Sequence, residues 1–354
     1  MKEQGKEYCH EVADVLTQVR EPSDIFVLMF PNAASFSVED IRLGSFYRRE
    51  LRPTSLFRQL NDIRDIMKIR DFKIKEALRD TGRFLLDVAR LKSSIILPAN
   101  GEELQSLTMR VIESSITGEP ISLLTPFCPD WSRDSEGRYD FKSLGGEISY
   151  IAQKFFKEGK PLLATFTKNK IPYRGELIFA DWGLETEIDA RDTYGRKLRQ
   201  EDIKACFAST LANTDELLLE MQHGKDGELF AQYRITQMTD FYKRQGVDPD
   251  LIYRQNEKFF RTNPKGIRLV EQLQRASIEI NRERLGLDEQ ENRKQAIQNL
   301  AEYATLGESF GEKGIIVAAE SNTSTRAYNL PRQRKLPVFF LKGKRSINEG
   351  VNIL

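Results

Sequence analysis

Gly314-Ile-Ile-Val-Ala-Ala319 is the stretch that decides the fold, because it is apolar or small throughout and ends at Glu320. A short run with no polar alternation is typical of a strand that is covered on both faces. Ile121-Ser-Leu-Leu-Thr125 and Glu176-Leu-Ile-Phe-Ala180 have nearly the same character. Strands of this kind belong to parallel sheets that lie between layers of helices, so the three segments predict an α/β protein.

Helical spacing of apolar residues fills most of the chain around these strands. Helices are predicted over 54–86, 102–115, 145–158 and 200–222, and then over 228–245, 249–260 and 264–308. Further strands are predicted over 24–30, 162–166 and 336–341. Between 227 and 309 the sequence shows no strand pattern.

The order of these elements predicts a Rossmann-like α/β fold, with a mostly parallel sheet, helices on both faces and a helical insertion or cap. We expect an N-terminal strand and helical portion over 1–94 and the first part of the α/β core over 95–226. The helical insertion or cap covers 227–309, and the C-terminal strands of the core lie in 310–354.

Composition excludes several functional classes. The chain has 354 residues, 40% of them hydrophobic and 30% charged, with a net charge of +1, which fits a folded protein and removes the usual electrostatic case for nucleic acid. Three cysteines without paired spacing predict a reducing, cytoplasmic location, and no apolar run is long enough to cross a membrane.

Because the only histidines are His10 and His223, histidine-based catalysis and metal binding are not expected. We expect a small-molecule substrate, and the oligomeric state stays open.

Ligands of parallel α/β sheets bind beyond the carboxyl ends of the strands, so the loops that follow the three buried runs are the candidate sites. After 121–125, Asp130 and Trp131 are predicted to bind an aromatic or cationic group, although a buried loop anchor is the alternative. Further on, Lys142, Gly145 and Gly146 stand at a helix start, where free N–H groups attract anions. A plain turn capped by Ser143 is the alternative there.

Carboxylates follow the apolar runs 176–180 and 314–319. Asp181 and Glu185 come soon after the first run and are candidates for acid–base catalysis or for binding Mg²⁺. The cofactor is therefore left unknown, with Mg²⁺ possible. Glu147 and Glu320 complete the predicted catalytic carboxylates.

Past the strand at 314–319, the predicted substrate ligands are Ser321, Thr323 and Arg326, since an arginine can clamp a carboxylate or phosphate at two points. A simple Ser/Thr turn is the alternative.

Residues 119–200 resemble the isocyanide (isonitrile) synthase family, also called the pyoverdine/dityrosine biosynthesis family. The matching features, in chain order, are Pro126-Phe127, Leu144-Gly145 with Glu147, Asp181 with Gly183, Tyr194, and Leu198-Arg199. The family has a Lys-Ser-Pro-Asn run where this chain has Cys128-Pro-Asp-Trp131, and Lys142-Ser143 comes later. The resemblance implies a Rossmann-like fold and condensation of an amino acid with ribulose 5-phosphate.

The sequence therefore predicts a biosynthetic enzyme of transferase or synthase type that acts on an amino-acid-like or phosphorylated substrate. Two other functions remain open. One is a Mg²⁺-dependent nucleotidyl- or glycosyltransferase, in which Asp181 and Glu185 hold the metal. The other is a non-enzymatic scaffold or effector protein that uses the helical segment 227–309 as a partner surface.

Overall fold

The computed structural model describes residues 19–30, 36–96, 101–127, 150–181, 200–285, 288–310, 314–319 and 322–342. The chain divides into two compact units. The first unit holds Met1–Ile121 and Pro161–Tyr173, and the second holds Ser122–Lys160 and Arg174–Leu354. The four-part division expected from the sequence stays a prediction.

The first unit is built from helices. They are α2 (Pro22–Met29), α3 (Val38–Glu50), α4 (Pro53–Met67), α5 (Asp71–Arg90), α6 (Gly101–Thr117) and α9 (Lys160–Lys168), with the short strand β1 (Ile95–Ile96). Tyr47 lies in the core, where its ring stacks on Phe30 at 5.5 Å between centroids. Its hydroxyl donates to the backbone oxygen of Leu85 at 2.7 Å, so the buried polar group is satisfied.

Two segments of the first unit are helices where strands were predicted. The run 24–30 lies in α2, because Pro22 occupies the first helical turn and the side chains of Glu21 and Asp24 form a reciprocal capping box. The run 162–166 lies in α9, where Leu162, Leu163 and Phe166 point into the core at helical spacing. Both runs are short and apolar, and apolar character alone does not separate a buried strand from a buried helix. The helix start expected at Pro53-Thr54-Ser55 is confirmed, but the N-cap is Arg52, not Thr54 or Ser55 as the sequence indicated.

The second unit contains the parallel sheet, as the sequence predicted. Its strands are β2 (Ile121–Phe127), β3 (Tyr173–Phe179), β4 (Tyr233–Gln237), β5 (Gly314–Ala318) and β6 (Val338–Leu341). They are neighbours in the order β6-β5-β2-β3-β4. The pairs β2–β5, β3–β4 and β5–β6 are parallel, with Ser122 opposite Gly314 and Gly175 opposite Tyr233. The fold class is therefore α/β, with a mostly parallel sheet.

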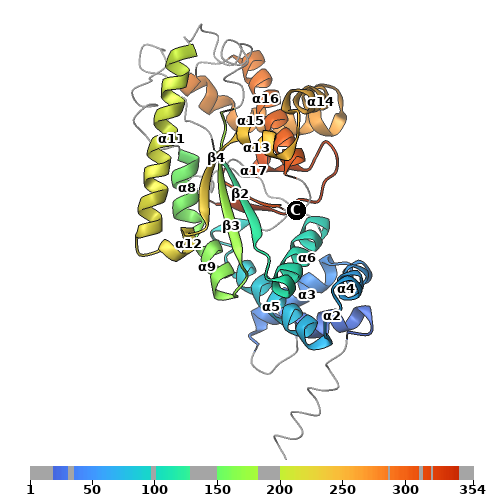
Figure 1. Ribbon diagram of the computed structural model, residues 1–354. Helices are drawn as coiled ribbons and strands as arrows, with labels where there is room; N and C mark the ends of the chain where they lie inside the picture. The colour runs from blue at the N-terminus through green and yellow to red at the C-terminus, as the bar shows by residue number, and fades with distance from the viewer. Residues whose placement is uncertain are drawn as a thin grey trace, which may run out of the picture. The chain divides into compact units, whose positions relative to one another are not determined.

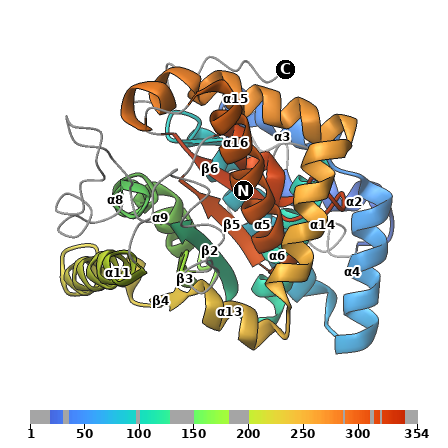
Figure 2. The ribbon, with the colours of Figure 1, turned by 90° about the horizontal axis from the view of Figure 1, so that it is seen from above.

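Helices cover both faces of this sheet (Figures 1 and 2). α8 (Tyr150–Glu158) and α11 (Gln200–His223) lie on one face, and α13 (Met238–Gln245) and α16 (Glu289–Ser309) lie on the other. The remaining helical elements are α12 (Gly227–Phe230), α14 (Pro249–Thr262), α15 (Pro264–Leu285), α17 (Asn322–Thr325) and the 3₁₀ turn η1 (Arg326–Tyr328). Rings of Phe179 and Phe207 meet at 5.3 Å on the α11 face, while Leu124, Ile178 and Ile316 belong to a buried cluster on the α13 face.

Strand β4 corrects the expectation that 227–309 is entirely helical. Its sequence, Tyr233-Arg-Ile-Thr-Gln237, alternates apolar and polar residues, which is the pattern of a half-buried strand. β4 lies at the end of the sheet next to α11. There the side-chain amide of Gln222 donates to the backbone oxygens of Phe230 at 3.0 Å and Tyr233 at 2.9 Å. No helix in the described ranges is long and apolar enough to cross a membrane.

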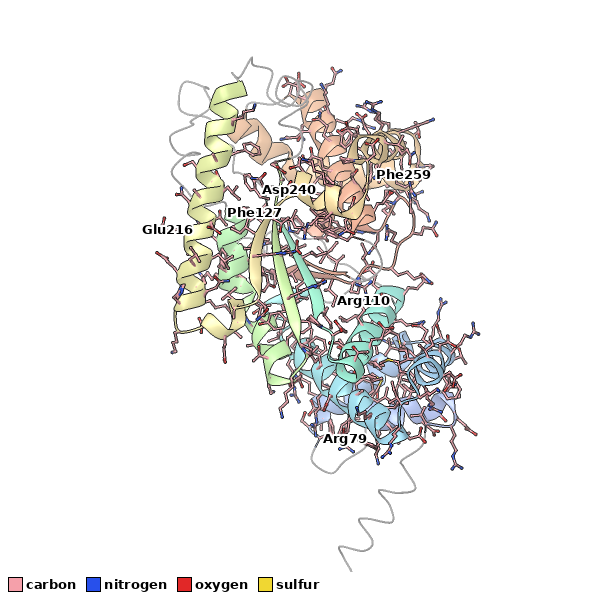
Figure 3. All side chains as sticks on the ribbon, viewed as in Figure 1. Arg79, Arg110, Phe127, Glu216, Asp240 and Phe259 are labelled. Carbon is pink, nitrogen blue, oxygen red and sulfur yellow. The ribbon has the colours of Figure 1, made fainter. Side chains whose placement is uncertain are left out.

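Close packing of α2 on α5 gives a test of the first unit. A Cβ atom added at Gly82 would lie 1.9 Å from the backbone oxygen of Met29, which cannot move without shifting α2. We expect Gly82→Ala to lower the free energy of unfolding by roughly 1–3 kcal/mol, the usual cost of overpacking. The measurement is chemical denaturation. Arg79→Ala, on the exposed face of the same helix (Figure 3), is the control and should change stability by less than about 0.5 kcal/mol. Equal stability of the two variants would contradict this packing.

Candidate functional site

The order of the strands places a topological switch point between β2 and β5. From β2 the chain continues to β3 and β4 on one side, and it later returns to β5 and β6 on the other side. Because β2 and β5 are parallel neighbours, the segments that follow them leave from the same edge of the sheet. Open α/β sheets bind their ligands at this place.

Most of the predicted site residues lie in those following segments, outside the described residues. They are Asp130, Trp131, Lys142, Gly145, Gly146, Glu147, Glu185, Glu320 and Ser321. Their roles stay predictions. Asp181, Arg326 and the backbone of Thr323, which belongs to α17, lie within the described ranges.

A buried lysine lies at this edge and was not singled out in the sequence. Lys154 of α8 is 9% exposed, and its ammonium group donates to the backbone oxygen of Ala319, just past β5, at 2.8 Å. It also lies 5.1 Å from the ring centroid of Phe340 on β6. Removing a cation from water is costly. Lys154 therefore places a positive charge at the carboxyl ends of β5 and β6.

Asp181 has a role in folding that the sequence did not indicate. Its side chain is 8% exposed and accepts hydrogen bonds from the backbone N–H of Thr239, at 2.9 Å, and from the Thr239 hydroxyl. Thr239 lies in the first turn of α13, where backbone N–H groups have no partner within the helix. Asp181 thus acts as the cap of α13 from outside that helix.

An open groove of about 1010 Å³, here called the β4 groove, lies beside this cap. Its residues come from the end of β3, from most of β4, from α11 and from the first and last turns of α13. The lining residues are Phe179, Asp181, Lys204, Phe207, Ala208, Leu211, Ala212, Asp215, Arg234, Ile235, Thr236, Gln237, Asp240, Lys243 and Arg244. Figure 3 shows Asp240 at the start of α13, near the carboxyl end of the sheet. The groove thus brings apolar, cationic and acidic side chains together along β4, the strand at the end of the sheet, and not at the switch point between β2 and β5.

Glu176 organises the cationic side of the β4 groove. Its carboxylate receives hydrogen bonds from Arg234, from Arg244 at 2.8 Å and from Thr236 at 3.1 Å, and its side chain is 13% exposed. Burial opposes its ionisation, but the two guanidinium groups outweigh burial and hold the pKa of Glu176 below its ordinary value. Arg234 and Arg244 are thereby fixed along the groove.

Arg326 lies apart from the β4 groove. It is exposed on η1, and its guanidinium donates to the side-chain oxygen of Gln272 on α15 at 3.2 Å. Arg326 is not one of the groove-lining residues, so the structure does not bring it together with Asp181 in this groove. Within the described part of the chain, no group of three or more histidine, cysteine, aspartate or glutamate side chains is arranged to hold a metal ion.

Several groove residues were missed because their signals resemble ordinary surface patterns. On α11, Lys204, Phe207, Leu211 and Asp215 recur at helical spacing, but a mixed stripe of this kind usually marks a half-buried helix face. The alternation in β4 was a usable signal. It was absorbed into a predicted helix because the run is only five residues long and is followed at once by α13.

Comparison of the sequence and the structure with known proteins does not establish a family for this chain. No family model matches the chain, and no curated protein matches it. The chain is similar to a solved structure titled "Crystal structure of Cyclo(L-leucyl-L-phenylalanyl) synthase", with a TM-score of 0.37 and 13% identity over 63% of this chain and 91% of that chain. A likeness this weak carries no argument about function. The isocyanide synthase resemblance stays a prediction, and the function has to be argued from the residues.

The cap formed by Asp181 gives a first test of this region. We expect Asp181→Ala to lower the free energy of unfolding by roughly 1–2 kcal/mol, because α13 loses an acceptor at its first turn. Asp181→Asn keeps one acceptor oxygen and should cost less. Denaturant unfolding of both variants provides the measurement. The outcome against this role is an alanine variant as stable as the parent chain.

Acid unfolding tests the Glu176 cluster. Because the pKa of Glu176 is lowered in the folded state, its ionised form adds stability above its ordinary pKa of 4.5, and this stability is lost as the pH falls further. Glu176→Gln should therefore be less stable near neutral pH and should show a shallower loss of stability between about pH 5 and pH 3. The measurement is the free energy of unfolding of both proteins across that pH range. If the pH profile of the variant ran parallel to that of the parent chain, ionised Glu176 would not stabilise the fold.

Proposed function

We propose that this chain is a small-molecule biosynthetic enzyme that binds an amino-acid-like substrate in the β4 groove. The observation that carries the proposal is the lining of the groove, which joins an apolar floor to side chains of both charges along β4 and at the end of β3. A zwitterion with an apolar side chain has the complementary features. The volume, about 1010 Å³, is at the upper end of the ~300–1,000 Å³ usual for small-molecule sites.

The apolar floor would hold the substrate side chain. It consists of Phe179 at the end of β3 together with Phe207 and Leu211 of α11. Phe179 is 1% exposed, and its ring is fixed by contacts of 5.1 Å with Phe127 and 5.3 Å with Phe207. Rigid aromatic side chains lose little entropy when a ligand binds, which favours them as a specificity surface.

The charged head group would bind on α13, between Asp240 in its first turn and Lys243 in its last turn. Asp240 and Lys243 lie one turn apart with 4.0 Å between carboxylate oxygen and ammonium nitrogen, and their side chains are 64% and 77% exposed. An exposed pair of this kind contributes little to stability. Its partners can therefore be exchanged at small cost for the ammonium and carboxylate of an amino acid.

A phosphorylated co-substrate is the second part of this proposal. Its support is the resemblance of residues 119–200 to isocyanide synthases, which implies ribulose 5-phosphate as the second substrate. Condensation of an amino acid with a sugar phosphate is therefore the first reaction to assay. Because the roles of Asp181 and Glu185 in metal binding are untested, each assay is run with and without Mg²⁺.

The test is to fill the groove. Leu211→Trp adds a large ring to the floor, whereas Leu219→Trp places the same ring on the same helix at a position that is 48% exposed and outside the groove. A thermal-shift screen of the amino acids on the parent chain identifies the ligand, since a compound that binds only the folded state raises the midpoint. Calorimetric titration then compares the two variants.

We expect Leu211→Trp to weaken binding of that amino acid at least about tenfold, equivalent to about 1.4 kcal/mol, and Leu219→Trp to leave it unchanged. Asp240→Asn should weaken binding of the amino acid more than binding of the analogue that lacks the amino group. Two results would count against the proposal. One is the absence of any amino acid that stabilises the chain, and the other is an equal loss of affinity in both tryptophan variants.

A further inference from the structure

The first unit contains a separate hollow of about 450 Å³, here called the α5–α9 hollow, between α5 and the end of α9. Four cationic side chains line it, namely Arg83, Arg90, Lys168 and Lys170, against two carboxylates, Asp80 and Asp87. The β4 groove belongs to the other unit and shares no residue with it. Asp40 also pairs with Arg90, so four cations stand against three carboxylates and the excess is one positive charge. The proposed function does not use this concave surface.

Asp87 holds two of these cations in fixed positions. Its carboxylate accepts hydrogen bonds from Arg90 at 2.9 Å, from Lys168 at 2.8 Å and from the side-chain amide of Asn169 at 3.1 Å, and its side chain is 13% exposed. The other amino group of Arg90 is bound by Asp40, which is 7% exposed. Cations held in this way lose little further freedom when an anion binds, and such preorganisation increases affinity.

The other two cations are bound more loosely. Arg83 lies 3.5 Å from Asp80, one helical turn away, and its side chain is 62% exposed. Lys170 is exposed and makes no ion pair or hydrogen bond through its side chain with any residue in the described ranges. Both can therefore turn toward a bound anion without breaking a buried contact.

The backbone of Lys170 is left-handed, with a φ angle of +55°. The residue stands just past the end of α9, where the backbone N–H of Ile171 bonds to the oxygen of Phe166 at 3.0 Å. Helices commonly end with glycine at this position, because other residues are strained there by about 1 kcal/mol. Lys68 and Gln333 are left-handed too and do not line the hollow, so the conformation alone does not mark a site, but it allows glycine to remove the Lys170 charge without adding strain.

We propose that the α5–α9 hollow binds the phosphate groups of a small molecule that carries a pyrophosphate. Arginine and lysine side chains are the usual protein ligands of phosphate oxygens. Two linked phosphates match four cations better than a single carboxylate does. The volume suits a metabolite, and the hollow is too small to enclose a polymer.

The test separates the side chain of Lys170 from its backbone strain. Lys68 provides a matched control, because it is also left-handed, with φ of +49°, at the end of α4, and it does not line the hollow. Lys170→Gly and Lys68→Gly each remove one positive charge and one strained backbone position. Each should raise the midpoint of thermal unfolding of the ligand-free chain by about 2 °C.

Inorganic pyrophosphate is the probe, titrated into the full chain by calorimetry at low ionic strength. We expect saturable binding that Lys170→Gly and Arg83→Gln each weaken about five- to tenfold, while Lys68→Gly leaves it unchanged. A variant that gains thermal stability and loses affinity is a result that a purely structural role of Lys170 does not produce.

Three outcomes would overturn the proposal. The first is no saturable binding of pyrophosphate to the parent chain. The second is an equal loss of affinity in Lys170→Gly and Lys68→Gly, which would mean attraction to net charge alone. The third is binding of a single-stranded oligonucleotide that pyrophosphate does not displace, because the surface would then serve a polymer. Leu211→Trp should bind pyrophosphate as the parent chain does, so this test is independent of the β4 groove.

Discussion

Parallel pairing of β2 with β5 is the constraint on which the second unit depends. Ser122 lies opposite Gly314 and Leu124 opposite Ile316, so segments far apart in the chain must meet in one register before the middle of the sheet exists. Contacts between distant segments form at a high entropic cost. The apolar character of both strands, all of whose described residues except Ser122 are buried, supplies the free energy that offsets this cost. The same pairing creates the switch point between β2 and β5, whereas the β4 groove lies two strands further along the sheet, beyond β3.

The central part of this fold could be read from the sequence. The strands near 121, 176, 314 and 338 are apolar runs that end at polar residues or proline, and the parallel α/β class follows from these runs. Short apolar runs without alternation were ambiguous, and two of them, at 24–30 and 162–166, are helices. For 24–30, Pro22 and the capping box around Asp24 were the local signals that distinguish a helix from a strand. For 162–166, Pro161 in the first turn of α9 was the corresponding local signal.

The candidate site was less predictable. Asp181 was singled out because it follows a strand, and its role in a ligand site stays a prediction. Its position after a strand could not reveal that its carboxylate caps α13, an element 58 residues further along the chain. The residues of the β4 groove come from α11, β4 and α13, and in each of these elements the charges look like an ordinary solvated surface. Lys154 illustrates the same limit, since a lysine beside the apolar face of a helix is usually exposed. Its burial depends on Ala319 and Phe340, which come from strands of the C-terminal part of the chain.

The amide of Gln222 has a consequence for how the protein behaves at high concentration. A strand at the end of a sheet offers its backbone to any other extended chain, and this is a common route to self-association and fibre growth. Gln222 occupies the backbone oxygen of Tyr233, at the first residue of β4, and ties it to α11. Arg234 adds a charge beside that position. The end of α11 therefore hinders pairing of another chain with the first half of β4, whereas the second half of β4 stays accessible.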